Sequence, residues 1–220
     1  MENYPEDDKK RKAFWKSQLM SARQFMKPFI EAGFVVMTPM FRGENGNPGH
    51  FEWWMGDIDD AAAAARWLAQ RPYVTSDRVY GLGWSYGGVV ALLLSLRDDT
   101  PLRLTGAIGG PVDTSFFGDP FNDPLIPFDR TNPEELQLRV PLGNLRWMQH
   151  EAYVYVGSVP IYDSDAESVE AALREVERWP DTPLEIIALP GEYSTPEFFR
   201  AAVSMFFEVV QNDMRGIVVR

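Results

Sequence analysis

Ser85 lies within a glycine-rich octet, Gly81-Leu82-Gly83-Trp84-Ser85-Tyr86-Gly87-Gly88, which contains the pattern G-x-S-x-G. This pattern is typical of a sharp turn between a strand and a helix that exposes a serine as a nucleophile. Glycines at positions 83 and 87 remove side chains that would collide with the neighbouring backbone, and the glycine at 88 lets the helix pack closely. We therefore predict Ser85 as the catalytic nucleophile, and the amide of Tyr86, at the start of the helix, as a donor to a developing oxyanion.

The base that Ser85 needs is not where this chemistry places it. A serine hydroxyl is a weak nucleophile until a base takes its proton, and that base is expected to be a histidine near the carboxyl end of the chain. The chain has two histidines, His50 and His150. His150 precedes a predicted strand, at the sheet edge opposite Ser85, and we interpret it as a surface or packing residue. His50 lies in a loop on the same edge as Ser85 and is expected to order the aromatic residues beside it; a catalytic role for it, with Asp113 as its partner, is the alternative.

Composition limits the classes of function. The chain has 220 residues, 45% of them hydrophobic and 24% charged, which predicts a globular domain with a sizeable core. Its net charge of −11 argues against nucleic acid or an anionic membrane as a partner. The absence of cysteine excludes disulfides, thiolate metal sites and a cysteine nucleophile. Because the first residues form no apolar signal segment and no apolar run is long enough to span a membrane, we expect a cytoplasmic protein.

Predicted strands and helices alternate along the chain. Strands are expected at residues 34–40, 78–82, 104–108, 152–157 and 184–189, and helices at 19–32, 57–70, 89–96, 164–179 and 196–211. Gly33 ends the first helix, acids open the second, Ser164 and Glu167 form a capping box, and Thr195 caps the last. Residues 113–149 are expected to form an irregular insertion over one edge of the sheet. This order predicts a single α/β domain over residues 1–220, with a charged segment at 1–18 and a mostly parallel sheet covered on both faces.

Two other interpretations of the glycine-rich turn are possible. One is a strand–helix junction without chemistry, since G-x-S-x-G alone is a common pattern. The other is a dinucleotide site, because Gly81 and Gly83 open a glycine-rich turn. That fingerprint requires a third glycine at position 86, which is tyrosine, and an acid at the end of the next strand, where the chain has Gly109-Gly110. These two mismatches argue against a nucleotide site.

Several separated motifs together resemble the prolyl-oligopeptidase-like branch of the α/β-hydrolases. The resemblance runs from about Met26 to the carboxyl terminus and implies a three-layer α/β-hydrolase fold. It also implies Ser85 as the nucleophile, Tyr86 as one oxyanion amide, and hydrolysis of a small ester or peptide without a cofactor or metal. The motifs are Met37–Gly46, Asp59-Asp60, Arg71–Val74, Asp77-Arg78 and Gly83–Gly88.

The chain departs from that family pattern at both partners of the nucleophile. The turn after strand 152–157 has Pro160 where the resemblance implies the triad acid. Asp163 and Asp165 follow closely, but we interpret them as acids at a helix N-terminus. The loop after the last strand has Tyr193 in place of the histidine. With a pKa of about 10, a phenol is a poor general base at neutral pH.

A third departure concerns the beginning of the chain. The resemblance implies an upstream strand ending in His-Gly-Gly, whose loop gives the other oxyanion amide, and the sequence has no such strand. We therefore expect the N-terminal strands of the sheet to be missing and favour the explanation that Met1 is not the true start. The alternatives are that a partner supplies the strand or that the sheet is rebuilt. A strand missing from the middle of a sheet leaves backbone groups unpaired.

Three functional hypotheses follow from the sequence. The first is a serine hydrolase with a degenerate triad and little turnover. The second is an active esterase or peptidase in which His50 serves Ser85 as a non-standard base. The third is a non-catalytic protein that binds a ligand or peptide in the former substrate pocket of a hydrolase. Most of the aromatic residues near the turn are expected to belong to the core, and lining that pocket is the alternative for them. They are Trp53, Trp54, Trp84, Tyr86, Phe116 and Phe117.

Overall fold

The computed structural model describes residue 23 and residues 25–109, 127–159 and 163–216, with only the backbone described for 163–168. It divides the chain into two compact units, Met1–Met37 and Thr38–Arg220. In the first, the helix α2 (Lys27–Glu31) has proline in its first turn and is followed by Gly33 at a φ of 87°, the left-handed conformation that ends helices. The helix stop predicted at Gly33 is therefore confirmed, whereas the predicted helical residues 19–22 lie outside the described part.

The second unit contains a four-stranded, fully parallel sheet in the order β1-β2-β3-β4. Its strands are β1 (Val79–Trp84), β2 (Leu102–Ile108), β3 (Glu151–Gly157) and β4 (Leu184–Leu189). Because the strands are parallel, their carboxyl ends meet at one edge of the sheet, which is where α/β proteins bind ligands. Ser85 follows β1 at this edge.

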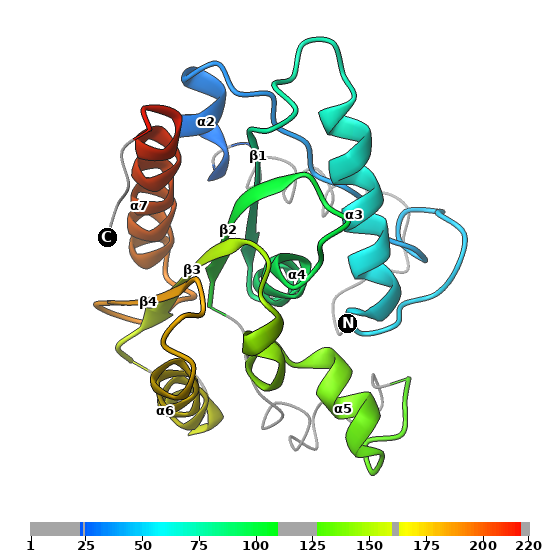
Figure 1. The fold of residues 1–220 in the computed structure, drawn as a ribbon, viewed down its shortest axis with the longest axis vertical. Helices are drawn as coiled ribbons and strands as arrows, with labels where there is room; N and C mark the ends of the chain where they lie inside the picture. The colour runs from blue at the N-terminus through cyan, green and yellow to red at the C-terminus, as the bar shows by residue number, and fades with distance from the viewer. Residues whose placement is uncertain (1–22, 24, 110–126, 160–162, 217–220) are drawn as a thin grey trace, which may run out of the picture. The chain divides into compact units, whose positions relative to one another are not determined.

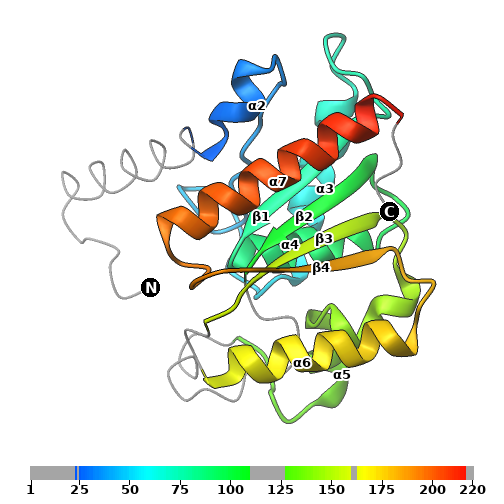
Figure 2. The same ribbon diagram turned by 90° about the vertical axis from the view of Figure 1, so that its left-hand side faces the viewer.

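Helices cover both faces of this sheet. Figures 1 and 2 show α7 (Pro196–Met214) along one face and α4 (Tyr86–Ser95) and α6 (Asp163–Arg178) along the other. The helix α3 (Met55–Ala69) packs its alanines, Ala61, Ala62 and Ala65, into the same apolar cluster as Val89 and Val90 of α4. The three-layer α/β arrangement predicted from the sequence is thus confirmed. Among the described helices, none has the length and apolarity needed to cross a membrane.

Residues 34–40 do not form the strand that their apolar character predicts. A strand is held by hydrogen bonds to a neighbouring strand, and no strand in the described part of the chain pairs with this segment. On the far side from β2, β1 likewise has no neighbour among the described strands. The prediction of a strand at 34–40 was therefore wrong, because apolar side chains alone supply no pairing partner.

Part of the stretch expected to be irregular is helical. Within residues 127–149 the chain forms α5 (Pro133–Arg139) and a short 3-10 helix, η3 (Leu142–Trp147). The local cause of α5 is a cap: the Asn132 side chain accepts a hydrogen bond from the Glu134 amide at 3.0 Å, and Pro133 occupies the first turn. Residues 113–126 lie outside the described part of the chain.

Of the two predicted helix caps, one is confirmed and the other lies on side chains that the structure does not describe. Thr195 caps α7 as predicted, since its hydroxyl accepts a hydrogen bond from the Phe198 amide at 3.3 Å. The capping box predicted for Ser164 and Glu167 falls on side chains that are not described, although α6 begins at Asp163, one residue from the predicted start.

Candidate active site

Ser85 joins β1 to α4 in a strained conformation, with φ of 51° and ψ of −116°. Such a backbone conformation costs a non-glycine residue on the order of 1–3 kcal/mol and persists only where the surroundings fix it. Here the Ser85 amide donates to Ile108 O at 2.9 Å, and Ser85 O accepts the first helical bonds from Gly88 and Val89. The turn is thus held between the end of β2 and the start of α4.

Of the glycines at 83, 87 and 88, two are sterically required. A Cβ on Gly83 would overlap the Gly87 carbonyl, and one on Gly88 would lie 2.8 Å from Gly109 O. At Gly87 itself nothing lies within 4 Å of a Cβ, so the collision expected there was wrong. The crowding arises from the backbone carbonyl of residue 87, and the absence of a side chain at residue 83 already relieves it.

Tyr86 is the first residue of α4, so its amide precedes the first intrahelical hydrogen bonds. Such N–H groups at the start of a helix point outward and, together with the helix dipole, favour a negative charge. This is the placement required of an oxyanion donor beside Ser85.

The side chain of Tyr86 is held by residues from the start of α3. Its hydroxyl donates to Asp57 Oδ2 and accepts from the Trp54 amide at 2.8 Å. The Trp54 amide also lies 3.2 Å from Asp57 Oδ2, and the Trp54 indole N–H donates to Tyr86 O at 3.2 Å. Burial raises the pKa of the Asp57 carboxyl and the pKa of the Tyr86 phenol. This network was not predicted from the sequence, because no local pattern links residues 29 positions apart.

A second charged group anchors the loop that precedes α3. The Arg42 side chain donates to both carboxylate oxygens of Asp60, at 3.1 and 2.9 Å, and its amide donates to Oδ2 at 2.8 Å. This guanidinium lowers the pKa of Asp60. Gly56 leaves the space that the guanidinium fills, since a Cβ there would overlap it. The polar loop that carries His50 is therefore fixed to α3 on the same side as the Tyr86 network.

Neither histidine is placed against Ser85 by a described contact. The His50 side chain is 81% exposed and lies 3.7 Å from Glu52 Oε1. His150 Nε2 lies 3.1 Å from Thr100 Oγ1 and 2.7 Å from Arg97 O, at the amino end of β3 and therefore at the opposite end of the sheet from Ser85. The packing role predicted for His150 agrees with these contacts. Asp113, the partner considered for His50, lies outside the described residues.

The loop after β4 brings Tyr193 to the edge of the sheet that carries Ser85. The Tyr193 ring fills the space that a Cβ on Gly109 would need, and Gly109 follows the residue whose carbonyl accepts from the Ser85 amide. The turns after β3 and β4 are joined, because the Val159 amide donates to Gly191 O at 3.2 Å and the Gly191 amide to Ser158 Oγ at 3.1 Å. Pro160 and the side chains of residues 163 and 165 are not described.

The aromatic residues near the turn separate into two groups. Trp53 and Trp54 are 5% and 1% exposed and pack with Phe51 and Tyr86, with ring centroids 5.3 to 6.0 Å apart. They belong to the core, as was expected of most of these aromatic residues. Trp84 instead is 47% exposed and contacts Phe199 of α7 edge-on at 5.6 Å. Phe116 and Phe117 lie outside the described residues.

A metal site is not apparent among the described side chains: nowhere in that part of the chain do three histidine, cysteine or acidic residues gather closely enough to hold an ion.

Comparison with known families identifies this arrangement. A family model described as X-Pro dipeptidyl-peptidase (S15 family) matches residues 2–115, just over half of the chain. The chain belongs to this family. An uncharacterized peptidase, YtmA, of Bacillus subtilis (strain 168) is 38% identical over 69 residues, which are 31% of this chain and 27% of that relative. A probable dipeptidyl-aminopeptidase B of Emericella nidulans is 32% identical over 113 residues, 46% of this chain and 12% of that one.

Solved structures show the same fold for this S15-family chain. Dipeptidyl peptidase 4 of Porphyromonas gingivalis superposes with a TM-score of 0.58 at 17% identity, covering 72% of this chain and 23% of that one. A puromycin hydrolase gives 0.59 at 19% identity, covering 76% and 26%. The predicted membership of the prolyl-oligopeptidase-like α/β-hydrolases is confirmed by these matches. The chain spans about a quarter of the length of these solved structures and about a third or less of its curated relatives.

Proposed function

We propose that this chain is a serine-hydrolase domain whose nucleophile elbow, Ser85 with the Tyr86 amide, is retained, and whose triad-dependent turnover of peptides or esters is impaired. The observation that carries the proposal is Tyr193: in the loop after β4, where the family resemblance implies a histidine, a phenol packs on Gly109 beside the Ser85 turn. The proposed ligand is a small ester or peptide.

The retained half of the machinery consists of the turn and the helix start. The Ser85 backbone is strained, and Gly83 lies close to the Gly87 carbonyl. The Tyr86 amide, at the start of α4, precedes the first hydrogen bonds within the helix. These features suit an exposed nucleophile next to an oxyanion donor. A turn without chemistry would gain nothing from a serine held at positive φ, since glycine adopts that conformation without strain.

The proposed impairment lies in the transfer of the proton from Ser85 to a base. Tyr193 is a phenol, which is protonated at neutral pH and accepts a proton poorly. His50 is exposed and faces Glu52, and His150 is bonded at the opposite end of the sheet. In a comparable triad, loss of the histidine alone lowers turnover on the order of a millionfold. The alternative in which His50 serves as the base therefore receives no support from its position.

The proposal is tested by reaction of the purified chain with a fluorophosphonate probe, read by intact mass and by peptide mapping. We expect modification of Ser85 that is orders of magnitude slower than in active serine hydrolases and absent in Ser85→Ala. Matched His50→Ala and His150→Ala variants should label like the parent chain. Rapid labelling of Ser85 in the parent chain would overturn the proposed impairment, and its loss in His50→Ala alone would identify His50 as the base.

A further inference from the structure

Strained residues gather at one place in the second unit. Four described non-glycine residues have positive φ, and three of them, Trp53 at 48°, Trp54 at 72° and Ser85 at 51°, lie in or next to the Tyr86 network. Positive φ is uncommon for bulky residues and is found where surrounding contacts fix the backbone, often at functional sites. Two consecutive tryptophans in this conformation, beside a strained serine, therefore require an explanation.

The burial of Asp57 is a second feature at the same place that lowers the stability of the fold. Its side chain is fully buried, and Oδ2 accepts from the Tyr86 hydroxyl and the Trp54 amide, whereas Oδ1 has no hydrogen-bond partner among the described residues. A buried carboxylate with one oxygen unpaired is unfavourable, and an apolar side chain of similar size would avoid that cost. Stability alone therefore does not account for an aspartate at position 57.

Helix capping explains only part of this arrangement. Asp57 is the third residue of α3, and its contact with the Trp54 amide is that of an ordinary N-terminal cap. An exposed acid makes the same contact without burial. The contact that capping leaves unexplained is the hydrogen bond from the Tyr86 phenol, which joins α3 to the first residue of α4.

Tyr86 is held at two points by residues of the α3 start. Its phenol is bonded to the Asp57 carboxylate and the Trp54 amide, and its carbonyl accepts from the Trp54 indole. The two rings also stack, with centroids 5.3 Å apart and an angle of 26°. With both its side chain and its carbonyl fixed, the remaining polar group of the residue, its amide, has a fixed direction beside Ser85.

We propose that Asp57 is a positioning residue of the Ser85 turn: by binding the Tyr86 phenol from the start of α3, it fixes the first residue of α4 and with it the amide that faces the reacting atoms. The inference rests on the proposed function only for the role of that amide as an oxyanion donor. The bracing of Tyr86 by Asp57 is a property of the folded chain and is measurable without substrate.

The test is hydrogen–deuterium exchange of the Ser85–Val90 backbone, compared with exchange in β3 as a measure of global opening. Asp57→Ala and Tyr86→Phe should accelerate exchange in Ser85–Val90 at least tenfold more than in β3, whereas Asp57→Asn, which keeps the acceptor oxygen, should stay near the parent chain. Tyr86→Phe is decisive, because it removes the phenol and leaves the cap on the Trp54 amide intact.

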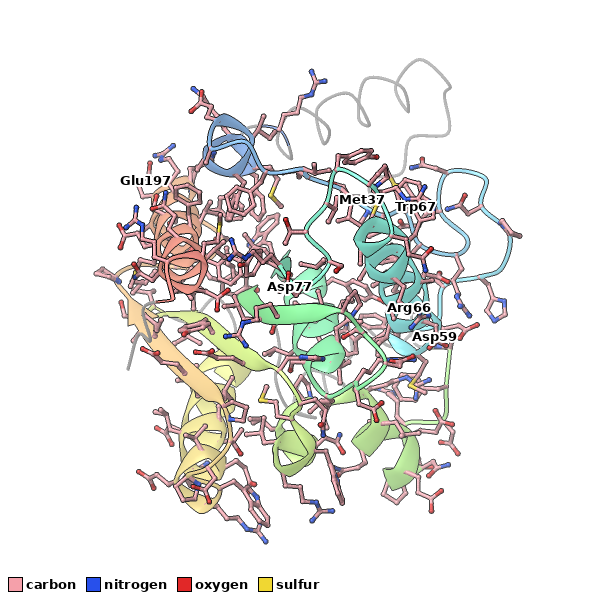
Figure 3. The ribbon with its side chains drawn as sticks, turned by 45° about the horizontal axis from the view of Figure 1, so that its top comes forward. Met37, Asp59, Arg66, Trp67, Asp77 and Glu197 are labelled. Atoms are coloured by element: carbon pink, nitrogen blue, oxygen red, sulfur yellow. The ribbon has the colours of Figure 1, made fainter. Side chains whose placement is uncertain are left out.

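A matched control lies on the same helix. The side chain of Asp59 is largely exposed and binds Arg97 at 2.6 Å. Figure 3 shows Asp59 on α3, the helix that also carries Arg66 and Trp67. Asp59→Ala should leave exchange at Ser85–Val90 unchanged. If Asp57→Ala does not fold, Tyr86→Phe and Asp57→Asn still decide the question. Equal acceleration in Ser85–Val90 and β3 for Tyr86→Phe would show that Asp57 acts as a cap only and would overturn the inference.

A second measurement connects the bracing to the reaction. Fluorophosphonate modification of Ser85 should be about tenfold slower in Tyr86→Phe and Asp57→Ala than in the parent chain, and unchanged in Asp59→Ala; tenfold corresponds to about 1.4 kcal/mol. Unchanged labelling together with faster local exchange would refute the role in positioning the amide. Rapid labelling of the parent chain would refute the proposed impairment. The exchange result would still test, independently of that outcome, whether Asp57 fixes Tyr86.

Discussion

The ring of Tyr193 lies against Gly109, in the space that a side chain at residue 109 would need. Gly109 has a φ of 61° and follows Ile108, whose carbonyl accepts a hydrogen bond from the Ser85 amide. The residue that stands in the place of the family histidine therefore packs against the neighbour in sequence of the carbonyl that fixes the serine. A single substitution at residue 193 therefore tests whether Ser85 becomes active when a histidine is placed beside it.

Tyr193→His should introduce Ser85-dependent hydrolysis of an activated ester such as p-nitrophenyl acetate. A positioned general base contributes roughly 10²–10⁴-fold. Because Pro160 stands where the family resemblance implies the acid that orients the imidazole, we expect the lower end, about a hundredfold. The rate should rise with pH through about 6.5, because only neutral imidazole accepts the serine proton.

The control for that gain is the double variant Tyr193→His with Ser85→Ala, which should hydrolyse no faster than the parent chain. A gain that survives loss of the serine hydroxyl would come from imidazole attacking the ester directly. No gain at all would mean that the loop after β4 does not bring residue 193 within reach of Ser85 Oγ.

Gly83→Ala and Gly87→Ala form a matched pair with opposite expected effects. The first places a methyl group on the Gly87 carbonyl and should destabilise the fold by about 1–3 kcal/mol. The second meets open space in the first turn of α4, where alanine is favoured over glycine by up to about 1 kcal/mol. Urea unfolding of both variants measures the difference, and equal losses would contradict the crowding seen at Gly83.

Local patterns in the sequence were sufficient to predict much of the fold. The strand at 184–189 and the Thr195 cap agree with the structure, because a short apolar run and a hydroxyl before proline act through near neighbours. Residues 34–40 are equally apolar but lack a described pairing strand, and α5 is too short for its periodicity to be clear. These differences reflect partners and packing, which one segment does not encode by itself.

In the candidate site, too, local patterns predict some residues, whereas contacts that depend on packing between helices are not predicted. Ser85 and Tyr86 were predicted because a glycine two residues before a serine in a strand–helix turn, here Gly83, has a local steric meaning. Asp57 was predicted only as an acid at a helix start, and its bond to Tyr86 depends on how α3 packs against α4. A carboxylate that follows two tryptophans in a helix start is the sequence signal that suggests burial, but it does not indicate the partner.

Asp60→Asn should destabilise the chain at neutral pH. Arg42 lowers the pKa of Asp60 in the folded state, so this carboxylate stabilises the fold above its unfolded pKa of about 3.9, and the stabilisation is lost as pH falls through the folded pKa. Loss of charged hydrogen bonds of this kind costs about 1–3 kcal/mol. Chemical denaturation at pH 7 and pH 3 should therefore show a large difference from the parent chain at pH 7 and a small one at pH 3. An equal difference at both values would exclude the Arg42 pair as its source.

Asp57→Asn should show the opposite dependence on pH. Burial raises the pKa of Asp57 in the folded state, so its contribution to stability is fully present below the unfolded pKa of about 3.9 and is lost as pH rises through the folded pKa. Each unit by which the folded pKa is raised corresponds to about 1.4 kcal/mol of stability lost at high pH. Asparagine keeps the acceptor for Tyr86 and does not ionise, so the variant should match the parent chain near pH 3.5 and exceed its stability increasingly above pH 4. Urea unfolding across pH 3.5–8 measures this, and a variant less stable than the parent at neutral pH would show that the ionised carboxylate itself stabilises the Tyr86 contact.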